Sequence, residues 1–228
     1  MKTSWKTACL YGVLLMGSIL SACSTSGMHA DRPTQHTSGI KTILILPFVN
    51  VSVLYEQNVH VRCYLCGQVM ATGYVPDSAG PFLTSELIFQ MEKNDHFTFL
   101  SSEGSADLIT GMMSGPDNAE DRYRNLYMQA GKRAGADAVL VGHIFRFNER
   151  KGNRASVESP ASVAFDLHLI DVETGRILWS ASCDETQRPL TDNILEIGTF
   201  MKRGASWVTA EELAQGGLET MLQRFPQP

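Results

Sequence analysis

Hydrophobic and polar positions follow two periods along this chain, and together they outline an alternation of strands and helices. Short apolar runs or apolar positions that alternate with polar ones are typical of strands, whereas apolar positions three and four residues apart are typical of helices. The pattern predicts strands at 41–47, 97–100, 138–147, 162–171 and 176–184. It predicts helices at 82–94, within 119–134, within 190–203 and after Thr209.

The last three predicted strands follow one another through short connections. Residues 162–171 alternate strictly, and Asp171–Arg176 has the composition of a tight turn, with Gly175 where a positive φ is needed. Residues 148–161 are charged and read as a hairpin loop, and 49–80 as a hairpin-like excursion or long loop. Thr209 and Glu212 have the spacing of a capping box, and each of Gly216 and Gly217 weakens the helix that follows by about 1 kcal/mol.

The order of these elements indicates the fold class. The portion built as strand, helix and strand favours parallel pairing, and the later strands form a three-stranded antiparallel meander. We therefore expect an α/β (α+β) fold with a mixed sheet and helices packed on it. Residues 40–228 are expected to form a single domain.

The first 23 residues predict where the protein works. Lys2 and Lys6 precede an apolar run that is too short for a membrane span, which needs about 20 residues. Leu20-Ser-Ala-Cys23 resembles the lipobox of bacterial lipoproteins, which implies cleavage of a signal peptide at 1–22 and lipidation of Cys23. Residues 23–39 then form a lipidated, flexible tether, in which the 16 residues 24–39 reach at most about 55 Å. Ser24 favours the outer membrane by resemblance to the sorting rule of enteric bacteria.

Composition narrows the classes of partner. Loss of Lys2 and Lys6 takes the formal charge from −5 to −7, and the chain has no block of Lys or Arg. Such a chain is poorly suited to bind nucleic acid. The expected partners are a membrane, through the lipid anchor, and envelope proteins, with a homo-oligomer left open.

The sequence contains none of the common catalytic motifs, such as a P-loop, a nucleophile elbow or His-Glu-x-x-His. His143, His168 and Asp166 lie on adjacent predicted strands, where they are either metal or acid–base candidates or polar residues on the wetter face of the sheet. We expect these three residues to be polar side chains on the wetter face of the sheet. We expect no enzyme activity and no cofactor.

The most specific local motif is the cysteine pair in Cys63-Tyr-Leu-Cys66. The pair is read as a structural disulfide or as plain thiols, with a redox pair and a zinc site as alternatives. A zinc site needs two further ligands, for which the sequence offers Cys183 and scattered histidines. Cys183 itself, on one face with Trp179, is expected in the core.

Three stretches in order resemble envelope lipoproteins of the LpoB, FlgO and CsgG type. Ile43–Phe48 resembles their opening strand, Gly135–Ile144 their central GADAVVVG strand, and Ala164–Trp179 the hairpin that follows. The resemblance implies a compact, non-catalytic periplasmic body that acts through protein contacts. Relatives activate a peptidoglycan synthase, support flagellar function, or form the pore for curli export.

Two departures affect these alternatives. Loop 148–161 is short and charged, which disfavours pore strands of about 9–11 residues. The tether is short for a synthase activator that crosses the peptidoglycan. The sequence thus predicts an outer-membrane-anchored, non-enzymatic interaction or assembly factor that faces the periplasm. Synthase activator, CsgG-like pore subunit, and CxxC redox or metal-binding protein remain alternatives.

Overall fold

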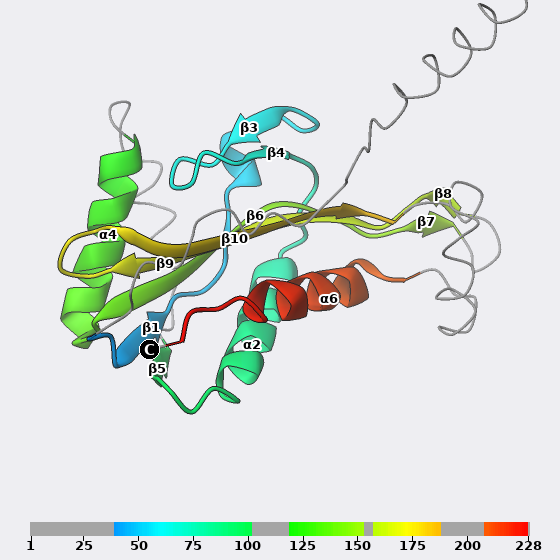
Figure 1. Ribbon diagram of the computed structural model, residues 1–228. Helices are drawn as coiled ribbons and strands as arrows, with labels where there is room; N and C mark the ends of the chain where they lie inside the picture. The colour runs from blue at the N-terminus through cyan, green and yellow to red at the C-terminus, as the bar shows by residue number, and fades with distance from the viewer. Residues whose placement is uncertain (1–38, 102–118, 153–156, 188–207, 228) are drawn as a thin grey trace, which may run out of the picture.

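A computed structural model of the chain describes residues 39–101, 119–152, 157–187 and 208–227 (Figure 1). Its main sheet has the strand order β10-β9-β6-β1-β5, with β2 paired to β6. The strands are β1 (Thr42–Ile45), β2 (Val49–Asn50), β5 (Thr98–Ser101), β6 (Ala138–Asn148), β9 (Ser162–Asp171) and β10 (Ile177–Thr186). The helices are α2 (Ala79–Met91), α4 (Ala119–Ala134) and α6 (Ala210–Leu222), with the short 3-10 helix η1 (Ser52–Leu54).

The sheet is mixed, which confirms the predicted fold class. β1 pairs in parallel with β5 and β6, whereas β9 pairs antiparallel with both β6 and β10. Two small hairpins complete the structure, β3 (His60–Arg62) with β4 (Val69–Ala71), and β7 (Lys151–Gly152) with β8 (Val157–Ser159). The region 49–80, for which the sequence left a hairpin-like excursion or a long loop open, contains the β3–β4 hairpin. The region 148–161, expected as a hairpin loop, contains the short β7–β8 pair. The helix predicted within 190–203, the signal segment and the tether lie outside the described residues.

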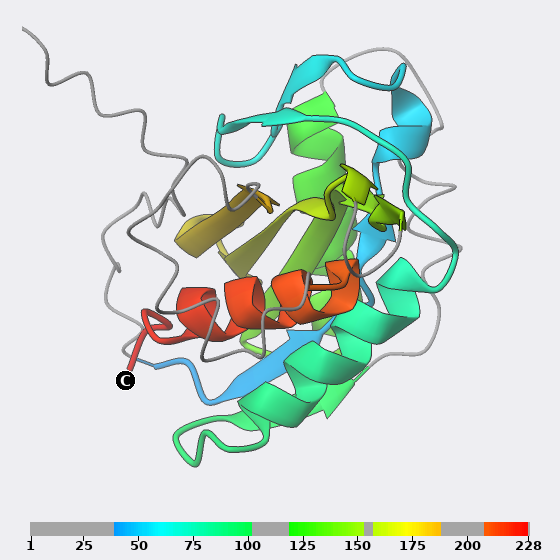
Figure 2. The same ribbon diagram turned by 90° about the vertical axis from the view of Figure 1, so that its right-hand side faces the viewer.

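Each face of the sheet has its own apolar core. Alternate side chains of β1 divide between them, since Ile43 and Ile45 face α2 and α6 whereas Leu44 faces α4. The second core is completed by residues 51–75, the covering segment, which contains η1, β3 and β4. Figure 2 shows α2 and α6 side by side against one face, with α4 on the other.

Local signals in the sequence explain several boundaries. Gly135 and Gly175 both have a positive φ, at the end of α4 and in the β9–β10 turn. The capping box at Thr209 and Glu212 is formed as predicted. α2 begins at Ala79, three residues before the predicted start, because Pro81 lies within the first turn, where no helical N–H is needed. Among the described helices, none is long and apolar enough to cross a membrane.

Candidate functional site

The Cys63–Cys66 pair lies in the tight turn that joins β3 to β4. The turn is closed by a hydrogen bond from the Gly67 amide to the Cys63 carbonyl (2.9 Å), and Gly67 adopts a φ of +80°. The Leu65 amide also donates to Cys63 Sγ at 3.4 Å. Cys63 is buried, Cys66 is partly exposed, and both are free thiols in this structure. The structural disulfide between Cys63 and Cys66, one of the alternatives from the sequence, stays a prediction.

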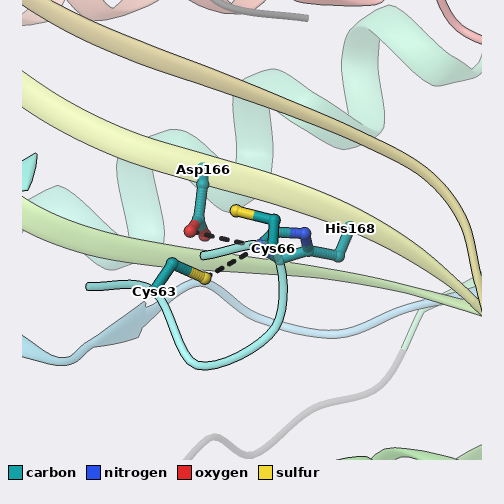
Figure 3. A group of neighbouring side chains, drawn as sticks. All are labelled: Cys63, Cys66, Asp166 and His168. Atoms are coloured by element: carbon teal, nitrogen blue, oxygen red, sulfur yellow. Dashed lines mark hydrogen bonds and ion pairs between the residues drawn. The ribbon is translucent and has the colours of Figure 1, made fainter. Parts of the chain in front are cut away.

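The covering segment places this turn directly over β9. Asp166 and His168 are two residues apart on β9, so their side chains share the face that the turn covers. The ligand atoms of Cys63, Cys66, Asp166 and His168 all lie within 4.8 Å of one another. Figure 3 shows the four side chains, called here the four-residue cluster, pointing toward one another from the turn and from the strand.

A buried polar network extends from the cluster across the sheet. Asp166 Oδ1 accepts a hydrogen bond from His143 Nδ1 at 2.8 Å, since the two residues are direct partners in the β6–β9 register. The other ring nitrogen of His143 lies 2.6 Å from the Tyr64 hydroxyl and 2.8 Å from that of Tyr127. Asp166 Oδ2 lies 3.0 Å from His168 Nε2, and this same nitrogen lies 3.5 Å from Cys63 Sγ.

Burial governs the charges in this network. Burial alone acts to raise the pKa of Asp166, but the nearby His168 and His143 outweigh it and hold that pKa well below its usual range. Burial also raises the pKa values of Tyr64 and Tyr127, which stay neutral hydroxyls. Asp166 is therefore a fully buried carboxylate, a costly group unless cationic or hydrogen-bonding partners surround it.

The two thiols differ in acidity because they share a hydrogen bond. That bond from Cys63 lowers the pKa of Cys66 to about 6, against the effect of burial, and His168 lowers it further. The same interaction raises the pKa of Cys63. Only one sulfur of the pair ionises readily, and it is the more exposed one.

These placements correct one expectation and confirm another. The strands carrying His143, Asp166 and His168 do not have a wetter face there, because all three residues are 0% exposed beneath the covering segment and α4. Cys183 and Trp179 lie in the core, as predicted. The sequence did not place Asp166 and His168 beside the cysteine pair. These two ionisable residues do interrupt the apolar middle of strand Ser162–Asp171, but the pattern alone does not show which segment covers them.

A surface groove forms where the covering segment meets the end of β6 and the β7–β8 hairpin. Residues from both sides line it, among them Asn58, Tyr74, Asn148 and Lys151. The walls are held together by backbone hydrogen bonds from Phe147 to the Tyr74 carbonyl (2.8 Å) and from Gly73 to the Phe145 carbonyl (2.9 Å). Tyr74 is 59% exposed, so the structure brings the two segments 49–80 and 148–161 to one accessible place, called here the end groove.

Comparison with known families gives a match over the middle of the chain. Residues 82–184 match the family described as peptidoglycan-synthase activator LpoB. This stretch runs from α2 into β10 and includes Asp166 and His168, whereas Cys63 and Cys66 precede it. The match confirms that the chain resembles LpoB-type proteins, which are non-enzymatic factors of the bacterial envelope. No curated protein matches the chain.

Solved structures also resemble the chain, with low sequence identity. A PelC dodecamer from Paraburkholderia phytofirmans is 14% identical with a TM-score of 0.49, and the match covers 86% of this chain and 94% of that one. Lipoprotein GNA1162 from Neisseria meningitidis is 16% identical with a TM-score of 0.37, over 72% and 93%. The C-terminal domain of LpoB from Escherichia coli is 18% identical with a TM-score of 0.33, over 69% and 88%.

Proposed function

We propose that this chain is a lipid-anchored periplasmic factor that activates a peptidoglycan synthase by direct contact. The family match over 82–184 carries this proposal, since that family is described by this activity. The match includes α4, β6, β9 and most of α2 and β10, which contribute to both cores, whereas β1 and α6 lie outside it. It therefore concerns a large part of the folded body rather than a local motif. Residues 40–228 are the single body that makes the contact.

The anchor is the second part of the proposal. Cys23 carries the lipid, residues 1–22 are removed, and 24–39 tether the body to the periplasmic side of the outer membrane. The support is the sequence Leu20-Ser-Ala-Cys23 behind a short apolar run. Radioactive palmitate should label the wild-type protein and leave Cys23→Ala unlabelled. Equal labelling of both forms would show that the lipid is elsewhere.

The end groove is the surface we assign to the partner. Its two walls come from different parts of the chain, and one exposed aromatic side chain, Tyr74, stands beside charged residues such as Lys151. Exposed aromatics with a polar surround are typical of protein interfaces. Because the tether is short for crossing the peptidoglycan, this proposal requires a synthase that itself reaches toward the outer membrane.

In-cell photocrosslinking tests the partner. A photoreactive amino acid at Tyr74 should give an adduct with a peptidoglycan synthase. The matched control is Phe89, which is 56% exposed on α2 and does not line the groove. The Phe89 form should give no such adduct. In a purified system, the wild-type chain should stimulate glycan polymerisation by the captured synthase, and Tyr74→Ala should stimulate it less.

The other outcomes each identify a different class of protein. Adducts only between copies of this chain, in a regular ladder, would replace the activator with an oligomeric assembly. Adducts only with unrelated envelope proteins would leave an interaction factor but refute synthase activation.

A further inference from the structure

The four-residue cluster has the donor atoms of a metal site. Two cysteine sulfurs come from the β3–β4 turn, and one carboxylate and one imidazole come from β9. Sulfur and nitrogen donors in a four-membered set are typical of tetrahedral zinc sites, in which carboxylate oxygens also occur. The cysteines have the two-residue spacing that such sites use.

The distances between the donors agree with a tetrahedron around one ion. For Zn–S bonds of about 2.3 Å and Zn–N bonds of about 2.0 Å, a sulfur and a nitrogen ligand lie about 3.5 Å apart. Cys63 Sγ and His168 Nε2 are 3.5 Å apart. Nitrogen and oxygen ligands are expected about 3.3 Å apart, and His168 Nε2 and Asp166 Oδ2 are 3.0 Å apart. No pair of donors exceeds 4.8 Å, so only small side-chain shifts are needed.

The turn that carries the cysteines is already shaped for this role. The amide of Leu65 donates to Cys63 Sγ, and the positive φ of Gly67 turns the chain immediately after Cys66. Arg62 closes the turn from outside by donating to the Gly67 carbonyl at 2.9 Å. Amide donors directed at sulfur stabilise the thiolate form that binds a metal.

The residues behind the cluster hold the carboxylate in one orientation. His143 donates to Asp166 Oδ1, which leaves Oδ2 directed at the cluster, 3.0 Å from His168 Nε2. Tyr64 and Tyr127 fix the far side of the His143 ring. Such supporting hydrogen bonds are a regular feature of metal sites in proteins, where they orient the ligands.

We propose that Cys63, Cys66, Asp166 and His168 bind one zinc ion. The ion joins the covering segment to β9, and four protein ligands fill its coordination sphere, so the site is structural rather than catalytic. The alternative for the same sulfurs is a disulfide, which would make no use of Asp166 or His168. The convergence of those two buried side chains on the turn is the observation that favours the metal.

The first test is the metal content of the full-length protein, extracted in detergent with and without reductant. We expect about one zinc per chain by elemental mass spectrometry. Cys66→Ser should lose stoichiometric zinc, and Asp166→Asn should bind it at least tenfold more weakly. The matched control is Cys183→Ala, because Cys183 is buried on β10 outside the cluster. It should keep its zinc.

A second test does not depend on the folding of any variant. Cobalt(II) added to the zinc-depleted wild-type protein should give the ligand-field bands of a tetrahedral ion and a thiolate-to-cobalt charge-transfer band. Zinc added afterwards should abolish both. Octahedral cobalt spectra, or an intact Cys63–Cys66 disulfide with no zinc in the purified protein, would overturn the proposal. So would a Cys66→Ser form that keeps stoichiometric zinc.

Discussion

Two adjacent glycines of α6 provide a direct test of how this helix packs on the sheet. Gly216 is exposed, and a Cβ added there would meet nothing within 4 Å. Gly217 is buried, and a Cβ added there would lie 2.5 Å from Cys183 Sγ and 3.3 Å from Phe165 Cζ. Alanine at either position should gain helix propensity of about 1 kcal/mol over glycine. Only the second substitution forces atoms into contact.

The magnitudes follow from this difference. Gly216→Ala should raise the free energy of unfolding by about 0.5–1 kcal/mol. In Gly217→Ala the same gain is offset by overpacking, which costs about 1–3 kcal/mol, because the Cys183 sulfur is itself fully buried. The two variants should therefore differ by about 1–3 kcal/mol in favour of Gly216→Ala. For a protein of this size each kcal/mol shifts the melting temperature by about 2–4 °C.

Urea unfolding followed by circular dichroism measures both variants under the same conditions. A Cys183→Ala background provides the control, since removal of the sulfur makes room for the new methyl group. There, Gly217→Ala should lose much less stability, with a coupling free energy of about 0.5–3 kcal/mol between the two sites. Two results would show that α6 does not pack on β10 as described. One is that Gly217→Ala stabilises the protein as much as Gly216→Ala does. The other is that Gly217→Ala lowers the free energy of unfolding by the same amount with and without the Cys183 sulfur.

Three further predictions concern other contacts. Thr209→Ala removes the side-chain acceptor for the Glu212 amide and should cost about 1 kcal/mol in urea unfolding, whereas Thr209→Ser should restore most of it. Arg146→Met removes hydrogen bonds to the Ala71 carbonyl (2.8 Å) and to Asp184 (2.6 Å), which should cost about 1.5–3 kcal/mol and speed hydrogen exchange at the Gly73 amide. Unchanged exchange there would contradict the role of Arg146 in holding the covering segment. In the reduced, metal-free protein, iodoacetamide should alkylate Cys66 before Cys63 and Cys183, as read by peptide mass spectrometry. The pKa of Cys66 is lowered to about 6, so its thiol becomes protonated as the pH falls through that value. The rate of Cys66 alkylation should fall over the same pH range, because the thiolate is the reactive form.

The main sheet could be predicted because its signals are local. Residues that face opposite sides of the sheet alternate strictly along β9, which lies between β6 and β10. The turn before β10 has a glycine where the backbone needs a positive φ. The capping box at Thr209 likewise lies within four residues. Helix α2 begins three residues before the predicted start, because apolar spacing does not show its first turn, which contains Pro81.

The cluster could not be predicted because its two halves come from segments with different kinds of signal. Cys63 and Cys66 lie in an irregular segment, whose path over the sheet depends on long-range contacts that periodicity does not describe. Asp166 and His168 lie in a regular strand, but the polar residues on one face of a strand indicate solvent unless something covers that face. The covering segment, together with α4, turns this polar face into a buried one, and that is a property of the tertiary structure.

The β3–β4 turn and residues 71–75 of the covering segment contact the sheet at separate places, and this separates the zinc proposal from the proposed function. The β3–β4 turn is held over β9 by the cluster, whereas residues 71–75 are held on β6 by the backbone bonds of Gly73 and Phe147 and by Arg146. Loss of the metal releases the first attachment and leaves the second, so Tyr74 keeps its place in the end groove. Cys66→Ser should then lose zinc and still give the Tyr74 adduct, while Arg146→Met should weaken the adduct and keep the zinc. A single variant that abolished both would mean that the covering segment moves as one unit.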